Sequence, residues 1–231
     1  MKLLAFDTSS LACTAALQIG TAVTVRHEEQ AREHTRLLLP MLRELLRESD
    51  VQPADLDAIV LGNGPGSFIG MRIAASVAQG LAFGSGIPVV PVSSLAAVAL
   101  QVISESPAEQ VVVTQDAHMD EVYLAAFRRA GARDIEVVID EQLHAVAPIE
   151  ALDTENAQNR VAAGAGWQRY PKLLNLNGDR LGDQAGVLHP NAQYLLPLGA
   201  AALAAGRSIK ARDLNPAYLR QKVAQKPAAR P

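Results

Sequence analysis

Residues 61–82 read LGNGPGSFIGMRIAASVAQGLA, a glycine-rich loop between an apolar run and a segment with helical periodicity. Loops of this kind often hold phosphate groups at the N-terminus of a helix. A P-loop needs a lysine and then a serine or threonine after its last glycine, whereas Met71 and Arg72 follow Gly70 here. A dinucleotide fingerprint needs a third glycine where this chain has Ser67. The stretch therefore predicts a tight turn with Ser67 as helix cap, and a helix N-terminus that attracts anions only in a general way.

Acidic turns follow the first strand of each half of the chain. Residues 2–20 predict strand, turn and strand around Asp7, and residues 111–129 repeat that order around Asp116. We interpret the repeat as a diverged internal duplication, the alternative being two unrelated hairpins with acidic turns. Two like domains that close over Mg-nucleotide would use such acids to hold the metal through water, unless each Asp only bonds its own turn. The candidate nucleotide-binding residues are Asp7, Gly64, Gly66, Ser67 and Asp116.

Two predicted helices carry more apolar or small side chains than one buried side requires. Between residues 35 and 48 the leucines cover an arc about twice as wide as one core-facing stripe. In residues 68–84 one row of small residues is Gly70, Ala74, Ala78 and Ala82, and a second is Ser76, Gly80 and Gly84. Rows of small residues let another helix approach closely. We predict that one side of each helix is buried in the protein's own core and another side in a partner protein. The alternative is that the two helices pack closely against each other within the protein. The predicted partner interface comprises Leu38, Leu42, Leu45, Gly70, Ala74, Ala78 and Ala82.

The remaining pattern alternates strands and helices, which predicts the α/β class. Residues 55–62 and 87–92 are expected as strands, and a helix capped by Ser93 or Ser94 follows them. A helix at about residues 191–206 ends at Gly206. The basic tail, residues 220–231, is expected to be solvated.

Composition limits the classes of function. The net charge of −3 over 231 residues argues against a protein that binds nucleic acid by itself. The single cysteine, Cys13, excludes an internal disulfide and lies in an apolar run, where we expect a small buried residue. The five histidines are not spaced as ligands on one element, so neither a metal nor a catalytic residue is expected. No signal peptide or membrane segment is recognised, so we expect a cytoplasmic protein.

Several stretches together resemble one family, the bacterial TsaB (YeaZ) proteins of tRNA threonylcarbamoyladenosine (t6A) biosynthesis. They are LLAFDTSSLACTAAL (3–17), HTRLLLPMLRELL (34–46), IVLGNGPGSFIGMRIAASVAQGLA (59–82), PVVPVSSLAAVA (88–99), DAHMDEVYLAAF (116–127) and NPAYLR (215–220). The resemblance implies the actin-like (ASKHA) fold with two related subdomains, expected at 1–104 and 105–231. The helix near 191–206 is then a candidate to pack back on the first subdomain.

The resemblance also implies a role. Family members work beside a paralogue, TsaD, which transfers threonylcarbamoyl to adenosine 37 of tRNAs that read codons beginning with A, and with the ATPase TsaE. The paralogue has two metal-binding histidines in a V-x-H-x-x-x-H motif, where this chain has Ser94 and Val98. Ile69 replaces the threonine that is usual in the loop, which weakens a phosphate contact.

We therefore expect a non-catalytic subunit that binds the TsaD paralogue, pairs with itself when alone and meets tRNA only within the complex. No cofactor is expected beyond weak ATP or ADP binding. The rival hypotheses are an autonomous actin-like nucleotide hydrolase or phosphotransferase, and a metallopeptidase, against which the missing histidine pair argues.

Overall fold

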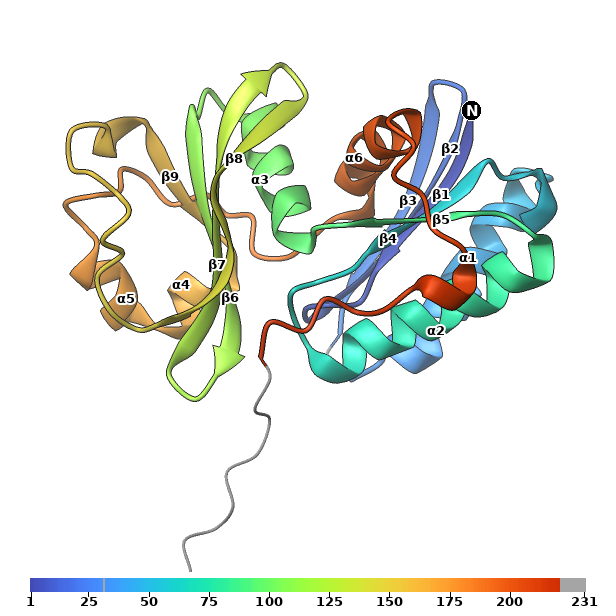
Figure 1. The fold of residues 1–231 in the computed structure, drawn as a ribbon, viewed down its shortest axis with the longest axis horizontal. Coiled ribbons are helices and arrows are strands. Elements are labelled where there is room, and N and C mark those ends of the chain that lie inside the picture. Colours follow the sequence, from blue (N-terminus) through green and yellow to red (C-terminus); the bar gives the residue numbers. More distant parts are fainter. Residues whose placement is uncertain (31, 221–231) are drawn as a thin grey trace, which may run out of the picture.

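Two mixed β-sheets with the same plan form the centre of the structure, a computed structural model that describes residues 1–30 and 32–220 (Figure 1). The first sheet has the strand order β3-β2-β1-β4-β5 and the second has β8-β7-β6-β9. Each begins with a three-stranded antiparallel meander, and the first strand of each meander then pairs in parallel with a later strand, β4 or β9. This shared plan confirms the predicted α/β class and the internal duplication.

The strands have these bounds: β1 Lys2–Asp7, β2 Ala12–Ile19, β3 Ala22–Glu29, β4 Ala58–Gly62, β5 Val89–Val92, β6 Gln110–His118, β7 Glu121–Gly131, β8 Asp134–Ala145 and β9 Arg160–Ala163. The helices are α1 His34–Glu48, α2 Phe68–Ser85, α3 Ser94–Glu105, α4 Ala165–Arg169, α5 Pro171–Leu176 and α6 Ala192–Ala204. Three short 3-10 turns, η1 Pro53–Asp55, η2 Ala157–Asn159 and η3 Ala211–Asp213, complete the described elements.

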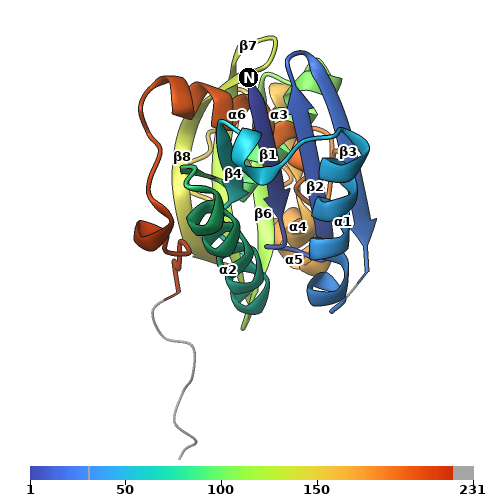
Figure 2. The same cartoon turned by 90° about the vertical axis from the view of Figure 1, so that its right-hand side faces the viewer.

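The helices lie in three layers about the two sheets. Helices α1 and α2 run side by side over the outer face of the first sheet (Figure 2). Helices α3 and α6 lie between the two sheets (Figure 1), and α4 and α5 cover the outer face of the second sheet. Helix α6 therefore packs on the first sheet although it follows the second in sequence. None of the described helices is both long and apolar enough to cross a membrane.

Strand alternation explains how one sheet serves two helix layers. On β1, Leu4 and Phe6 pack with α1 and α2, whereas Leu3 and Ala5 pack with α6. Successive side chains of a strand point to opposite faces, so a strand buried on both faces is a continuous apolar run. Cys13 of β2 is fully buried, as predicted, and its sulfur lies 3.9 Å from that of Met41 on α1.

This packing shows that the residues predicted as a partner interface belong to the core instead. All seven of its residues are buried in the core that α1 and α2 share with the first sheet: Leu38, Leu42, Leu45, Gly70, Ala74, Ala78 and Ala82. The inward-facing row of α2 is thus the one that was assigned to a partner. The other row, Ser76, Gly80 and Gly84, faces outward, and a Cβ added at Gly80 or Gly84 would meet nothing within 4 Å.

Helix ends follow local capping chemistry. Ser67 accepts a hydrogen bond from the Gly70 backbone N–H at 3.2 Å, and Ser93 accepts one from Ala96 at 2.9 Å, as cap residues do. Helix α1 instead begins after Glu33, without a side-chain cap. Helix α6 ends at Ala204, and Gly206 follows in the left-handed region at φ +72°.

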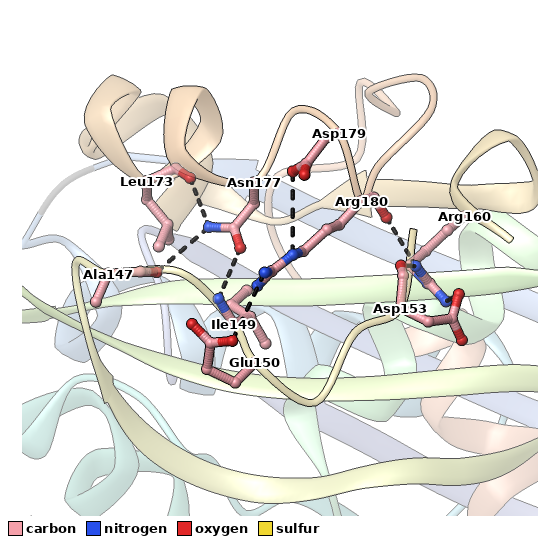
Figure 3. Close-up of polar contacts among 9 residues, drawn as sticks. All are labelled: Ala147, Ile149, Glu150, Asp153, Arg160, Leu173, Asn177, Asp179 and Arg180. Atoms are coloured by element: carbon pink, nitrogen blue, oxygen red, sulfur yellow. Dashed lines mark hydrogen bonds and ion pairs between the residues drawn. The ribbon is translucent and has the colours of Figure 1, made fainter. Parts of the chain in front are cut away.

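Two buried polar side chains hold the irregular segments on the outer side of the second sheet (Figure 3). The amide of Asn177, which is fully buried, accepts from the Ile149 backbone N–H at 2.7 Å and donates to the carbonyls of Ala147 and Leu173. The guanidinium of Arg160 donates to the carbonyls of Asp153 and Arg180, each at 2.8 Å. These bonds give backbone groups of the irregular segments hydrogen-bond partners. Of the basic tail predicted at 220–231, residues 221–231 lie outside the described residues.

Candidate functional site: the glycine loop, the inter-subdomain cavity and the face of α1 and α2

The glycines of the 62–70 loop make room for the chain's own backbone. A Cβ at Gly70 would lie 1.8 Å from the Thr8 carbonyl oxygen, and a Cβ at Gly66 would lie 2.2 Å from that of Ser9. Two hydrogen bonds fasten this approach: the Ser67 backbone N–H donates to the Ser9 carbonyl at 2.6 Å, and the Thr8 hydroxyl donates to the Gly70 carbonyl at 2.7 Å. The loop therefore clasps the β1–β2 turn, which occupies the space beside its glycines.

Asp7 is enclosed in the same junction. Its carboxylate accepts hydrogen bonds from the Ser9 backbone N–H at 2.6 Å and from the Ser94 hydroxyl at 2.5 Å, and the residue is fully buried. The Ser94 hydroxyl in turn accepts from the Gly64 N–H at 3.0 Å. Burial raises the pKa of Asp7, and the Ser94 and Ser9 hydrogen bonds oppose that shift. Asp7, Gly64 and Ser94 thus join β1, the loop and α3.

A cavity of about 850 Å³ lies between the two subdomains, next to this junction. Of the predicted nucleotide-binding residues, Gly66, Ser67 and Asp116 line it, whereas Asp7 and Gly64 are buried behind it. Its cationic side chains are Arg32 and Arg169, and the Arg169 Nε lies 3.7 Å from an Asp116 carboxylate oxygen. The structure therefore brings together three of the five predicted residues.

Asp116 is already bonded within the second subdomain. One carboxylate oxygen accepts from the His118 backbone N–H at 2.8 Å and from the Tyr170 hydroxyl at 2.9 Å. The bond to its own turn is the local role that was the alternative to metal binding. Among the described residues, no three His, Cys, Asp or Glu side chains gather closely enough to hold a metal ion.

Two histidines were missed as residues of the cavity wall. His34, which begins α1, and His189, which precedes α6, both line the cavity. The Nε2 of His34 and the Nδ1 of His189 are buried and have no hydrogen-bond partner among the described residues. Burial lowers the pKa of His189. No sequence signal places them together, because 154 positions separate them and only the layer order brings them to one wall.

The second half repeats the glycine clasp. A Cβ at Gly164 would lie 2.1 Å from the Thr114 carbonyl oxygen, and a Cβ at Gly166 would lie 2.5 Å from the Thr114 hydroxyl. Gly164 has φ +93°, which a residue with a side chain rarely adopts. The loop after β9 therefore approaches β6 much as the loop after β4 approaches β1.

An apolar surface remains exposed on α1 and α2. We call it the α1–α2 face and define it by Leu39, Ile69, Ile73, Ser76, Val77 and Gly80. Ile69 is 70% exposed and Leu39 is 50% exposed. All of these except Gly80 line a groove of about 500 Å³ between the two helices. Patches of clustered apolar side chains mark interaction sites more often than isolated exposed residues do.

Comparison with known proteins identifies relatives of this chain. The family profile described as TsaD, tRNA N6-adenosine threonylcarbamoyltransferase, matches residues 24–191. Two curated proteins named tRNA threonylcarbamoyladenosine biosynthesis protein TsaB are each 36% identical to the chain. The Haemophilus influenzae protein aligns over 98% of this chain and 96% of its own, and the Escherichia coli protein over 98% and 97%.

Solved structures agree with the curated relatives. A Pseudomonas aeruginosa protein described as similar to peptidase YEAZ superposes with a TM-score of 0.86 at 36% identity, over 95% of this chain and 99% of its own. The structure described as YeaZ from Pseudomonas aeruginosa gives a TM-score of 0.80 at 35% identity, over 94% and 99%. The two-subdomain architecture is thus the actin-like fold. The chain belongs to the TsaB (YeaZ) family of tRNA threonylcarbamoyladenosine biosynthesis proteins.

Proposed function

We propose that the protein is a non-catalytic subunit of the complex that installs threonylcarbamoyl on adenosine 37 of tRNAs reading codons that begin with A. The pathway is taken from the names of the TsaB relatives. The observation that carries the subunit role is the α1–α2 face, where Ile69 and Leu39 stay exposed after both helices have buried their inner sides. A face of this kind is stabilised when another protein removes it from water.

The proposed occupant is the TsaD paralogue. A profile of that family matches 24–191 of this chain, so the two proteins share an ancestry and a helix-on-helix contact between related surfaces is natural. For the same reason the free protein would pair with itself through the same face. The ATPase TsaE would join the heterodimer, and tRNA would be met only within the complex, in keeping with the net charge of −3.

The buried junction supports a non-catalytic role. Ser94 and Val98 stand where the paralogue's metal-binding histidines are expected, and both are fully buried here. The Ser94 hydroxyl is bonded to Asp7 and to the Gly64 N–H, so this position contributes to packing.

Co-purification with the TsaD paralogue tests the proposal. Gly80→Arg places a long charged side chain on the α1–α2 face, at a helix position where a Cβ meets nothing within 4 Å. Gly186→Arg is the matched control, because a Cβ there also meets nothing within 4 Å and the residue is exposed in the second subdomain. We expect Gly80→Arg to stay folded and to lose partner binding by about a hundredfold or more, and Gly186→Arg to bind as the wild type does. Full binding by a folded Gly80→Arg protein would place the interface elsewhere.

Nucleotide binding is proposed to be weak. The β1–β2 turn occupies the space beside the loop glycines, and Asp7 is enclosed away from the cavity. Calorimetry with ATP and Mg on the isolated protein should give no dissociation constant below about 10 μM, which corresponds to about −7 kcal/mol. Tighter binding would favour the alternative, an autonomous actin-like nucleotide hydrolase or phosphotransferase.

A further inference from the structure

The last described segment of the chain follows α6 and connects the first subdomain to the second. After α6, Ile209 pairs with Val89 at the edge of the first sheet, and Leu214 is buried in the core beneath α2. From η3 the chain then runs across α2 toward the β6–β7 turn (the red segment below the centre of Figure 1). We call residues 215–220 the C-terminal strap.

The first half of the strap is fixed to the first subdomain at the glycine loop. The Asn63 side-chain amide donates to the Asn215 carbonyl at 3.0 Å, and the Ala217 N–H donates to the Asn63 carbonyl at 3.3 Å. The Tyr218 hydroxyl accepts from the Arg72 Nε at 2.8 Å. The Tyr218 ring lies 5.1 Å from the ring of Phe68, the first residue of α2, a distance at which aromatic pairs attract.

The second half is fixed to the second subdomain by one side chain. The Arg220 guanidinium donates to the Ala117 carbonyl at 2.9 Å and to the His118 carbonyl at 3.3 Å, and it pairs with the Glu121 carboxylate. The side chain is only 13% exposed, so these charge-assisted bonds are largely shielded from water. Ala117, His118 and Glu121 all belong to the β6–β7 hairpin.

The hairpin that Arg220 holds has an unusual backbone. His118, Met119 and Asp120 have φ angles of 60°, 56° and 56°, so three consecutive residues with side chains lie in the left-handed region. Such a conformation costs free energy and persists where surrounding contacts impose it. Two of Arg220's acceptors are carbonyls of this turn or of the residue before it, and Asp116 and His118 line the inter-subdomain cavity.

We propose that the C-terminal strap is an intramolecular clamp that fixes the angle between the two subdomains and with it the width of the cavity. The strap joins two elements that line the cavity from opposite subdomains: the N-terminal end of α2, through Ile69 and Gly70, and the β6–β7 turn, through His118. A hinge motion that opened the cavity would have to break the Arg220 contacts or pull Tyr218 from Phe68 and Arg72. The clamp does not depend on the proposed function, because it is a property of the isolated chain.

Arg220→Gln in the full-length protein tests the clamp, with Arg207→Gln as the matched control. Arg207 is an exposed arginine just after α6, and its side chain forms no hydrogen bond or ion pair with the described residues. The first measurement is amide hydrogen exchange at residues 116–121. We expect exchange there to rise by about tenfold in Arg220→Gln and to stay at the wild-type rate in Arg207→Gln.

The second measurement is a distance distribution between spin labels at Arg47→Cys on α1 and Lys172→Cys on α5, both exposed positions in different subdomains. The native Cys13 is fully buried and does not compete for the label. We expect one narrow distribution in the wild-type background and a broader, longer one with Arg220→Gln. Glu121→Gln should give a smaller change in the same direction, since the two carbonyl bonds remain.

Two outcomes would overturn the proposal. The first is an unchanged exchange rate at 116–121 and an unchanged distance distribution in a folded Arg220→Gln protein. The second is faster exchange confined to residues 215–220, which would make the strap a passive end that rests on the surface.

Discussion

The resemblance of the 62–70 loop to a phosphate cradle has a residue-level cause. A loop that approaches a phosphate and a loop that approaches another backbone both need glycine, because neither tolerates a Cβ. Here the atoms in the way are the Thr8 and Ser9 carbonyl oxygens, which lie 1.8 and 2.2 Å from the Cβ positions of Gly70 and Gly66. A glycine pattern in a sequence therefore predicts a close approach without stating what approaches.

Alanine at Gly70 should destabilise the protein, whereas alanine at Gly80 should not. Both residues lie in α2, so the change in helix propensity is the same, about 1 kcal/mol in favour of alanine. At Gly70 the backbone of Thr8 must shift, and we expect a net loss of more than about 2 kcal/mol in the free energy of unfolding. Gly80→Ala should gain about 0.5–1 kcal/mol. Urea denaturation of the two variants measures both, and equal effects would show that the clasp yields easily.

Asp7 gives the protein a distinctive dependence on pH. Burial raises the pKa of Asp7 above its ordinary value of 3.8, so the folded state keeps this proton to a higher pH than the unfolded state does. The stabilising contribution is complete below the unfolded pKa and is lost as pH rises through the folded pKa. Asp7→Asn removes this titration, so its stability relative to the wild type should rise as pH increases above about 4. Urea denaturation of both proteins at a series of pH values tests this, and a stability difference that does not change with pH would contradict it.

At the scale of elements, the sequence shows which residues lie on one face of a helix but not which face points toward the sheet. Two rows of small residues on α2 could be predicted, but which row faces the sheet depends on how the helix is rotated. That rotation is set by Gly70 against Thr8 and by the core beneath, contacts that join positions far apart in the chain. Strand β8 was missed although its sequence, DIEVVIDEQLHA, is half apolar and largely alternates apolar with polar residues, which is itself a strand signal; it pairs with the edge of β7. The short, apolar strands and the capped helices were predictable because their signals are local.

Arginine at Ala78 should unfold the protein, in contrast to arginine at Ser76. Ala78 is fully buried against the first sheet, so a guanidinium there would lose its hydration without a partner. Ser76 is exposed two residues earlier on the same helix. We expect Ala78→Arg to lack cooperative thermal unfolding in circular dichroism, and Ser76→Arg to melt within a few degrees of the wild type. A folded Ala78→Arg protein would mean that α2 is rotated relative to this structure.

At the scale of the whole molecule, the duplication was predictable and the chain's return path was only partly so. Asp7 and Asp116 are equivalent because both lie at the C-terminal end of the first strand of a meander, and the pattern of strands around them repeats. The cavity residues His34 and His189 were not predictable, because they come to line one cavity only through the packing of distant segments on the first sheet. The core of the first subdomain is therefore built from two separate parts of the sequence.

That discontinuity predicts how fragments behave. Residues 1–105 alone would expose Leu3, Ala5 and Val60, the face that Leu195 and Leu196 of α6 cover. Burying two leucines contributes about 3–6 kcal/mol, comparable with the whole stability of a small domain. The ends of α3 and α6 lie close together, since the Tyr194 hydroxyl donates to Glu105 at 2.5 Å.

A short Gly-Ser linker can therefore join residues 1–105 to residues 190–218. We expect the joined protein to unfold cooperatively in urea and to give dispersed amide resonances, and residues 1–105 alone to aggregate or to lack a cooperative transition. The joined protein with Leu195→Asp is the control, because it restores the length of the chain without the apolar contact, and it should behave as the shorter fragment does. If residues 1–105 fold alone with the same transition, the first sheet does not need α6, and the return of the chain serves only to place the C-terminal strap.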